Sequence, residues 1–115
     1  MRNIDSLKKN SEFQNVYQKR DSRANRLLVM YKAENGTDRF RIGISVSKKV
    51  GNSIVRHRLT RLIREAYRLN RGRFQTGYDI VVVARAAARE KGYGEMEQAF
   101  LHLGGLHHIM NGESK

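Results

Sequence analysis

The chain contains no cysteine, no proline and no tryptophan. Without cysteine it can form neither a disulfide framework nor a thiolate metal site. It has no apolar run long enough to cross a bilayer, and its first residues do not contain the apolar stretch of a signal peptide. These absences argue against a disulfide-rich secreted module and an integral membrane protein. We therefore expect a cytoplasmic protein without a membrane partner.

Acidic residues are scarce where basic residues are densest. The 115 residues carry a formal net charge of +12, and residues 39–73 hold 11 of the 23 lysines and arginines but a single acid, Glu65. The segments before and after this block are closer to balance, with 8 basic and 5 acidic residues in the first and 4 and 5 in the second. A basic block this concentrated indicates a binding surface for a polyanion, and nucleic acid is the first candidate.

The sequence also lacks the clustered groups that a self-sufficient nuclease needs. Asp5, Asp21, Asp38 and Asp79 are scattered along the chain, so no spacing predicts a Mg²⁺ site held by carboxylates. The three C-terminal histidines do not have the i,i+4 spacing of two helical metal ligands. We predict no catalytic residue and no cofactor or metal bound by the protein alone, and we assign any chemistry to a partner.

The N-terminal half of the chain has the patterns of one helix and two strands. Ser11 and Gln14 fit a capping box, and apolar residues at helical spacing predict a helix over residues 12–19. Alternating apolar residues predict strands over residues 27–33 and 39–46. A turn-like segment separates these two strands, which we expect to form a hairpin.

The C-terminal half adds a helix over residues 53–69 and a strand over residues 79–85. The strand is apolar and β-branched, which is typical of a central strand covered on both faces. A last helix is expected over residues 94–103, with Met96, Ala99, Phe100 and Leu103 facing inward, and should end at the Gly104-Gly105 pair. We predict an α+β fold for the whole chain: a single-domain, two-layer sandwich with a mixed sheet of about four strands, three of which can be located.

The helix over residues 53–69 has two different faces. One is an apolar stripe at helical spacing, expected to dock on the sheet: Val55, Leu59, Leu62, Ala66 and Leu69. The other, here called the basic ladder, lies roughly opposite: His57, Arg61, Arg64 and Arg68. Arg56 and Arg58 flank the boundary between the faces. Lys48, Lys49 and Asn52 precede the helix and fit a phosphate site at its N-terminus.

A charged helix face is usually a solvated surface, but three features favour RNA binding here. The face has one acid, whereas a solubilising face mixes acids and bases at i,i+4. Arg56 and Arg58 lie in the first turns, where the helix dipole disfavours cations. The cations are arginines, which fork onto phosphates and stack on bases. A helix that accepts these penalties is expected to bind a polyanion.

Residues 42–67 resemble the signature of the bacterial ribonuclease P protein family. In that family an Arg-Asn-Arg triplet opens a basic helix, and here the triplet is Arg56-His57-Arg58, followed by further arginines at helical spacing. The resemblance extends upstream to residues 13–17 and 24–26 and downstream to residues 79–85. His57 departs from the usual Asn, although its ring nitrogens can also donate and accept hydrogen bonds.

The resemblance implies a fold and a function. It implies a sheet with a left-handed βαβ crossover, against the general rule for such connections. It also implies an accessory subunit of an endoribonuclease in which a catalytic RNA removes the 5′ leader of precursor tRNA. The protein would bind both RNAs, hold the leader in a cleft between the first helix and the sheet, and help the RNA to hold Mg²⁺.

Five residues are candidates for that cleft. Phe13 and Tyr17 share one face of the first helix, Val29 and Tyr31 share a strand face, and Ser45 lies on the small, polar face of the next strand. Single-stranded RNA is held by stacking its bases on such aromatic rings. The competing interpretation is that Phe13 and Tyr17 are ordinary core residues.

Two other functions remain open from the residues alone. A general RNA- or DNA-binding module, such as a ribosomal protein, would show the same charge. An amphipathic membrane-surface helix is less favoured, because the apolar stripe is needed for the sheet and the helix lacks Trp or Phe anchors.

Overall fold

The computed structural model describes residues 5–112. Three α-helices, four strands and two short 3-10 helices follow one another in the order α1, β1, β2, β3, α2, η1, β4, η2, α3. Their bounds are Asn10–Gln18 (α1), Ser22–Ala24 (β1), Leu28–Glu34 (β2), Phe40–Ser45 (β3), Ser53–Asn70 (α2), Arg71–Arg73 (η1), Tyr78–Ala84 (β4), Ala86–Ala88 (η2) and Tyr93–Leu106 (α3).

The four strands form one mixed sheet in the order β1-β2-β4-β3. β2 is antiparallel to both β1 and β4, and β3 is parallel to β4. The fourth strand that the sequence could not locate is β1, three residues long and mostly exposed at the sheet edge. The predicted hairpin between the strands over residues 27–33 and 39–46 is wrong, because β4 lies between them.

β4 takes the central position because both of its faces are apolar. Ile80, Val81 and Val82 are fully buried, and a strand with two apolar faces is stable only where both are covered. The loop that joins β2 to β3 is wide enough for β4 to pair between these two strands. The backbone N–H of Asn35 donates to the carbonyl of Gly77 (2.9 Å), and the N–H of Gly77 donates to the carbonyl of Arg39 (2.8 Å).

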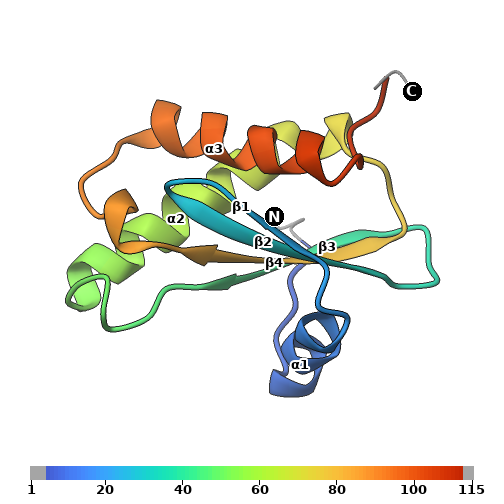
Figure 1. The fold of residues 1–115 in the computed structure, drawn as a ribbon, viewed down its shortest axis with the longest axis horizontal. Helices are drawn as coiled ribbons and strands as arrows, with labels where there is room; N and C mark the ends of the chain where they lie inside the picture. The colour runs from blue at the N-terminus through green and yellow to red at the C-terminus, as the bar shows by residue number, and fades with distance from the viewer. Residues whose placement is uncertain (1–4, 113–115) are drawn as a thin grey trace.

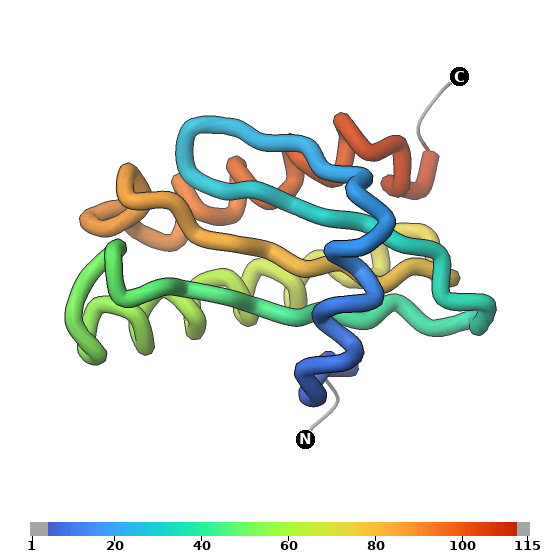
Figure 2. The backbone as a smooth tube through the Cα atoms, turned by 60° about the horizontal axis from the view of Figure 1, so that its bottom comes forward, coloured from blue at the N-terminus to red at the C-terminus, as the bar shows by residue number. Residues whose placement is uncertain are grey.

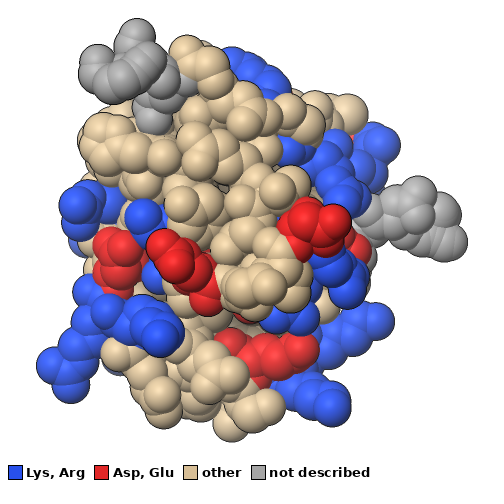
Figure 3. Space-filling view, turned by 90° about the vertical axis from the view of Figure 1, so that its right-hand side faces the viewer, with Lys and Arg blue, Asp and Glu red and all other residues tan. Residues whose placement is uncertain are grey.

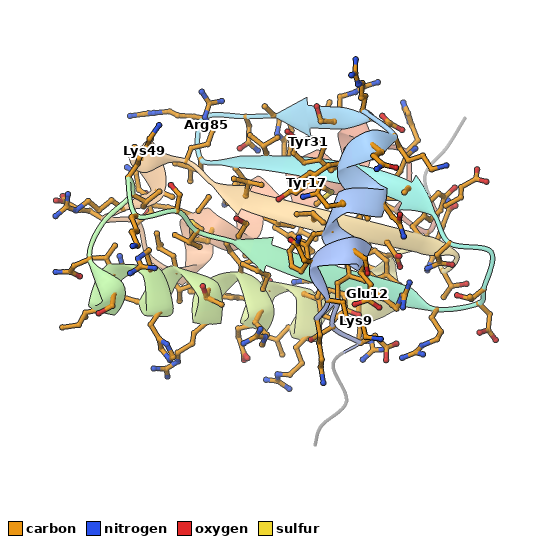
Figure 4. All side chains as sticks on the ribbon, turned by 90° about the horizontal axis from the view of Figure 1, so that it is seen from below. Lys9, Glu12, Tyr17, Tyr31, Lys49 and Arg85 are labelled. Carbon is orange, nitrogen blue, oxygen red and sulfur yellow. The ribbon has the colours of Figure 1, made fainter. Side chains whose placement is uncertain are left out.

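The connection from β3 through α2 to β4 is left-handed. In Figure 4 both strands point to the left and β4 lies above β3, while α2 lies on the far side of the sheet from the viewer. Figure 1 shows that α2 and α3 together cover this far face, and α1 lies on the other. The α+β sandwich is thus confirmed, with α1 crossing the outer face of the sheet (Figure 2).

The main core lies between the sheet and the α2–α3 layer. Leu28 and Met30 of β2, Ile42 of β3, and Ile80 and Val82 of β4 point into it. The four inward residues expected on the last helix are all buried: Met96, Ala99, Phe100 and Leu103. No helix of the described residues is long and apolar enough to cross a membrane.

The apolar stripe of α2 is rotated from the predicted one. Leu59 and Ala66 are buried as expected, Val55 and Leu62 pack at the margin, and Leu69 is 54% exposed. The buried positions that the pattern missed are Ile63, Tyr67 and Asn70. Tyr67 and Asn70 were missed because both carry polar atoms, which the structure satisfies: the Tyr67 hydroxyl donates to the carbonyl of Phe40, and the Asn70 amide donates to the carbonyl of Ala66.

The start of α1 lies two residues before the predicted one. The helix begins at Asn10 rather than residue 12, so Glu12, not Gln14, occupies the N3 position. Glu12 Oε1 accepts from the backbone N–H groups of Lys8 (2.7 Å) and Lys9 (2.9 Å). These hydrogen bonds lower the pKa of the Glu12 carboxyl.

The end of α3 also differs, because the helix continues through Gly104 and Gly105 to Leu106. Gly104 is buried against Phe74, which follows η1, and Met110. A Cβ atom there would lie 2.6 Å from the Phe74 ring and 2.7 Å from the Met110 sulfur. The glycine therefore permits close packing rather than ending the helix, and this gain outweighs its weak helix propensity.

Two substitutions in α3 separate packing from propensity. Gly94→Ala, where nothing lies within 4 Å of the added methyl group, should stabilise the protein by up to about 1 kcal/mol through helix propensity. Gly104→Ala should instead destabilise it by about 1–3 kcal/mol through overpacking. Urea unfolding followed by circular dichroism measures both. A stabilised Gly104→Ala protein would contradict the packing argument.

Candidate RNA-binding surfaces

Alternate residues of three strands form two rows on the face of the sheet that α1 crosses. Val29, Val83 and Ser45 are partners across β2, β4 and β3, and Tyr31 pairs with Val81 in the next row. Val29, Tyr31, Ser45 and Val83 are half-buried. The predicted strand faces are therefore correct, and they bring the three strand residues of the expected cleft together.

The two aromatic residues of α1 lie against these rows. The Phe13 ring covers Gly43, where a Cβ atom would be only 2.7 Å from the ring. The Tyr17 ring meets that of Tyr31 edge-on, with 4.8 Å between centroids. Burial raises the pKa of Tyr17, an effect that the neighbouring Ser45 side chain partly offsets. We call this surface the aromatic face: Phe13, Tyr17, Val29, Tyr31, Ser45 and Val83.

The geometry agrees in part with each interpretation of Phe13 and Tyr17, as core residues and as residues of a binding surface. The two rings pack beside the fully buried Val16, which is the true core residue of α1. They nevertheless stay half-buried rather than buried. Each ring therefore stabilises the docking of α1 and still offers surface to a partner.

A polar cluster fixes α1 and the sheet at the other side of the same face. Arg41 donates from Nε to Asp79 Oδ1 (2.8 Å) and from Nη2 to Asp79 Oδ2 (2.7 Å). The Asn35 amide donates to the same carboxylate, and Glu12 of α1 lies 3.6 Å from Arg41. Figure 4 shows Glu12 at the opposite end of α1 from Tyr17. The orientation of α1 across the sheet is thus fixed by both charges and rings.

The carboxylates of Asp5 and Asp79 pair with arginines. Asp5 accepts from Arg39 (2.7 Å) and Arg71 (3.3 Å), and the Arg39 hydrogen bond lowers the pKa of Asp5. Among residues 5–112 no three His, Asp or Glu side chains are grouped so that they could hold a metal ion. Of the C-terminal histidines, His107 is buried with Nε2 2.8 Å from the carbonyl oxygen of Met30.

The basic ladder faces solvent along α2. Its four members, His57, Arg61, Arg64 and Arg68, are all exposed. Arg68 is neutralised locally by Glu65, with 2.7 Å between Nη2 and Oε2, and this hydrogen bond lowers the pKa of Glu65. The other three make no hydrogen bond or ion pair with the part of the chain that the structure describes.

The two arginines of the triplet have different surroundings. Arg58 donates from Nη1 to the carbonyl of Lys91 (2.9 Å) and from Nη2 to that of Arg89. Arg56 lies on the sheet side of α2 and is half-buried; its Nε atom has no hydrogen-bond partner within the described residues. Arg58 therefore joins α2 to the segment before α3. Arg56 instead has a buried Nε donor that no acceptor among the described residues satisfies.

The loop before α2 carries the remaining predicted residues. Lys48 and Lys49 are exposed, and Asn52 is the N-cap, its Oδ1 accepting from the backbone N–H of Val55 (3.0 Å). Lys49 lies with Arg85 at the end of the sheet where β3 and β4 finish (Figure 4). The opposite end of the molecule mixes acidic side chains among the basic ones (Figure 3).

Sequence reasoning missed three residues of these surfaces. Val83 lies in the aromatic face, but β4 is apolar on both sides, so its pattern does not separate the faces. Gly43 permits the approach of Phe13, and its place beside Ser45 on the small face of β3 was the available signal. Arg85 is the last residue of the predicted strand, whereas in the structure it follows β4.

Comparisons with known proteins agree with this geometry. The family model described as Ribonuclease P matches residues 1–106. The ribonuclease P protein component of Lachnoclostridium phytofermentans is 53% identical over 107 residues, covering 93% of this chain and 92% of that relative. The protein component of Alkaliphilus metalliredigens is 52% identical over 103 residues, covering 90% and 93%.

Solved structures show the same fold. The RNase P protein of Staphylococcus aureus superposes with a TM-score of 0.85 at 35% identity, covering 95% of this chain and 100% of that one. The RNase P protein of Thermotoga maritima gives a TM-score of 0.80 at 29% identity, covering 90% and 96%. With this likeness along nearly its whole length, the chain belongs to the family of bacterial ribonuclease P protein components.

Proposed function

We propose that this chain is the protein subunit of a ribonuclease P, holding a catalytic RNA with α2 and the 5′ leader of precursor tRNA on the aromatic face. The observation that carries the proposal is the presence of two RNA-compatible surfaces on one small domain. They are separated by the thickness of the sheet and joined by the short β3–α2 loop. Such a domain can touch two RNAs at once.

The basic ladder suits the folded catalytic RNA. Arg61 and Arg64 follow His57 at i,i+4 and i,i+3 spacing, and the two arginine charges repel each other unless an anion lies between them. A guanidinium group donates two parallel hydrogen bonds to a phosphate. Lys48 and Lys49 extend the surface toward the sheet. The exposed face of α2 is therefore a row of phosphate contacts.

The aromatic face suits a single strand. Its rings and valines are half-buried in a surface framed by α1, and bases of a duplex cannot reach such a surface because their faces are stacked. Splayed bases of a single strand can stack on Phe13, Tyr17 and Tyr31. The basic Lys49 and Arg85 lie at the end of this face, where a strand's phosphates would pass.

The protein then assists cleavage without performing it. In the assembled enzyme we expect the RNA to hold the Mg²⁺ ions and to catalyse hydrolysis, and the protein to bring two polyanions together. Its charge of +12 reduces the repulsion between leader and catalytic RNA. We place this work in the cytoplasm. The family membership favours this function over that of a general RNA-binding module.

Reconstitution tests the proposal. Adding the protein to a bacterial ribonuclease P RNA at low Mg²⁺ should accelerate removal of the leader from a precursor tRNA, because protein cations replace part of the counterion requirement. Cleavage is followed on a gel with end-labelled substrate. A rate equal to that of the RNA alone, over a range of protein concentrations, would contradict the proposal.

The aromatic face is tested by leader discrimination. In the assembled complex, Tyr17→Ala should weaken binding of precursor tRNA by about tenfold, since stacking on one base contributes about 1–3 kcal/mol. Binding of mature tRNA should not change. Tyr17→Phe keeps the ring and should retain most of the affinity, and Gln14→Ala on the exposed side of α1 serves as control. An equal loss of affinity for both tRNA forms would contradict the assignment of the leader to this face.

The basic ladder is tested by comparing two arginines. Arg64→Ala should lower affinity for the catalytic RNA and reduce the slope of log affinity against log salt by about one, leaving stability unchanged. Arg58→Ala should also destabilise the free protein by about 1 kcal/mol, because two carbonyls lose their donor. Salt titrations and urea unfolding measure the two effects. If Arg58→Ala leaves stability unchanged, the structural role assigned to this arginine is wrong.

A further inference from the structure

Ile54 is an apolar residue placed among cations and exposed to solvent. It is 78% exposed, more than Leu69 and Leu106, the other large hydrophobic side chains exposed among residues 5–112. It lies in the first turn of α2, three residues before His57 and seven before Arg61, and so extends the line of the basic ladder. A single exposed aliphatic side chain is ordinary, so its neighbours decide what it means.

A shallow hollow on the surface of α2 surrounds Ile54. It is lined by Ser53, Ile54, His57, Arg58 and Arg61. The Arg58 side chain is held by the carbonyls of Arg89 and Lys91, so one wall is fixed in place. His57 and Arg61 make no hydrogen bond or ion pair with the described residues and are available to a ligand.

The chemistry of this hollow is that of a nucleotide. An aliphatic side chain and a flat imidazole together offer surface to an aromatic ring. A guanidinium group on either side offers donors to phosphate and can stack on a base. A site for phosphate alone does not require an apolar side chain such as Ile54. A site for an apolar ligand does not require two guanidinium groups.

We propose that this hollow takes one unpaired base of the catalytic RNA. The base packs against Ile54 and the imidazole of His57, and Arg61 contacts its phosphate. The base must be unpaired, because the faces of paired bases are covered by their neighbours and the A-form major groove is too narrow for side chains. This proposal rests on the proposed function. It adds a contact that depends on the shape of the RNA rather than on its charge.

The proposal separates Ile54 from the arginines by salt dependence. Ile54→Ser removes apolar surface but no charge. It should weaken binding of the catalytic RNA by about tenfold, in the range of lost base contacts, with an unchanged slope of log affinity against log salt. His57→Tyr should retain affinity and His57→Ala should lose it, because only the tyrosine keeps a ring for stacking.

Leu69→Ser is the matched control, since Leu69 is also an exposed apolar residue of α2 but lies at its other end, outside the hollow. It should bind the RNA as the unchanged protein does. Circular dichroism and urea unfolding confirm that both serine variants are folded. Equal affinities of the Ile54→Ser and unchanged proteins, or equal losses for Ile54→Ser and Leu69→Ser, would overturn the proposal.

Chemical probing of the RNA then identifies the nucleotide. The unchanged protein should protect one unpaired base that Ile54→Ser leaves reactive. An abasic substitution at that position should weaken binding of the unchanged protein and add nothing to Ile54→Ser, as expected for two changes to one contact. Additive losses would overturn the base contact. If the unchanged protein neither binds the RNA nor speeds cleavage, the proposed function itself fails.

Discussion

The docking of α2 on the sheet is the contact on which both candidate surfaces depend. Leu59, Ile63 and Tyr67 are fully buried beneath the helix, and burial of each large side chain contributes about 1.5–3 kcal/mol. Repulsion between like charges at i,i+4 on the outer face costs only about 0.2–0.5 kcal/mol per pair. The buried face therefore decides the orientation of α2. The basic ladder then faces solvent at a small cost in folding free energy.

The same sheet provides the second surface through small residues on β3. Gly43 and Ser45 leave room for Phe13 and Tyr17 to lie close to the strands, while Ile42 and Ile44 on the opposite side fill the main core. Larger side chains at these two positions would lift α1 from the sheet. The alternation of large and small residues along one strand thus builds the core on one face and the aromatic face on the other.

The sequence predicted most of the local structure and missed the pairing of distant segments. The strand faces and the inward side of α3 follow from periodicities of 2 and 3.6 residues, which a short segment is enough to show. The order of the strands does not, because the insertion of β4 beside β2 depends on contacts about 50 residues apart. Arg58 illustrates the same limit. Its partners are backbone carbonyls 31 and 33 residues away, and a carbonyl has no sequence signature.

The geometry of a helix explains why the Arg56-His57-Arg58 triplet cannot act as one contact. Consecutive residues are turned by about 100° around the axis, so three in a row point in three directions. Arg56 points toward the sheet side with a buried donor, His57 points to solvent in the basic ladder, and Arg58 joins the segment before α3. An Asn in place of His57 would change only the side chain that points to solvent, because Arg56 and Arg58 point in other directions from the helix axis. The triplet therefore links three surroundings of α2, and its central residue lies between Ile54 and Arg61 in the surface proposed for RNA.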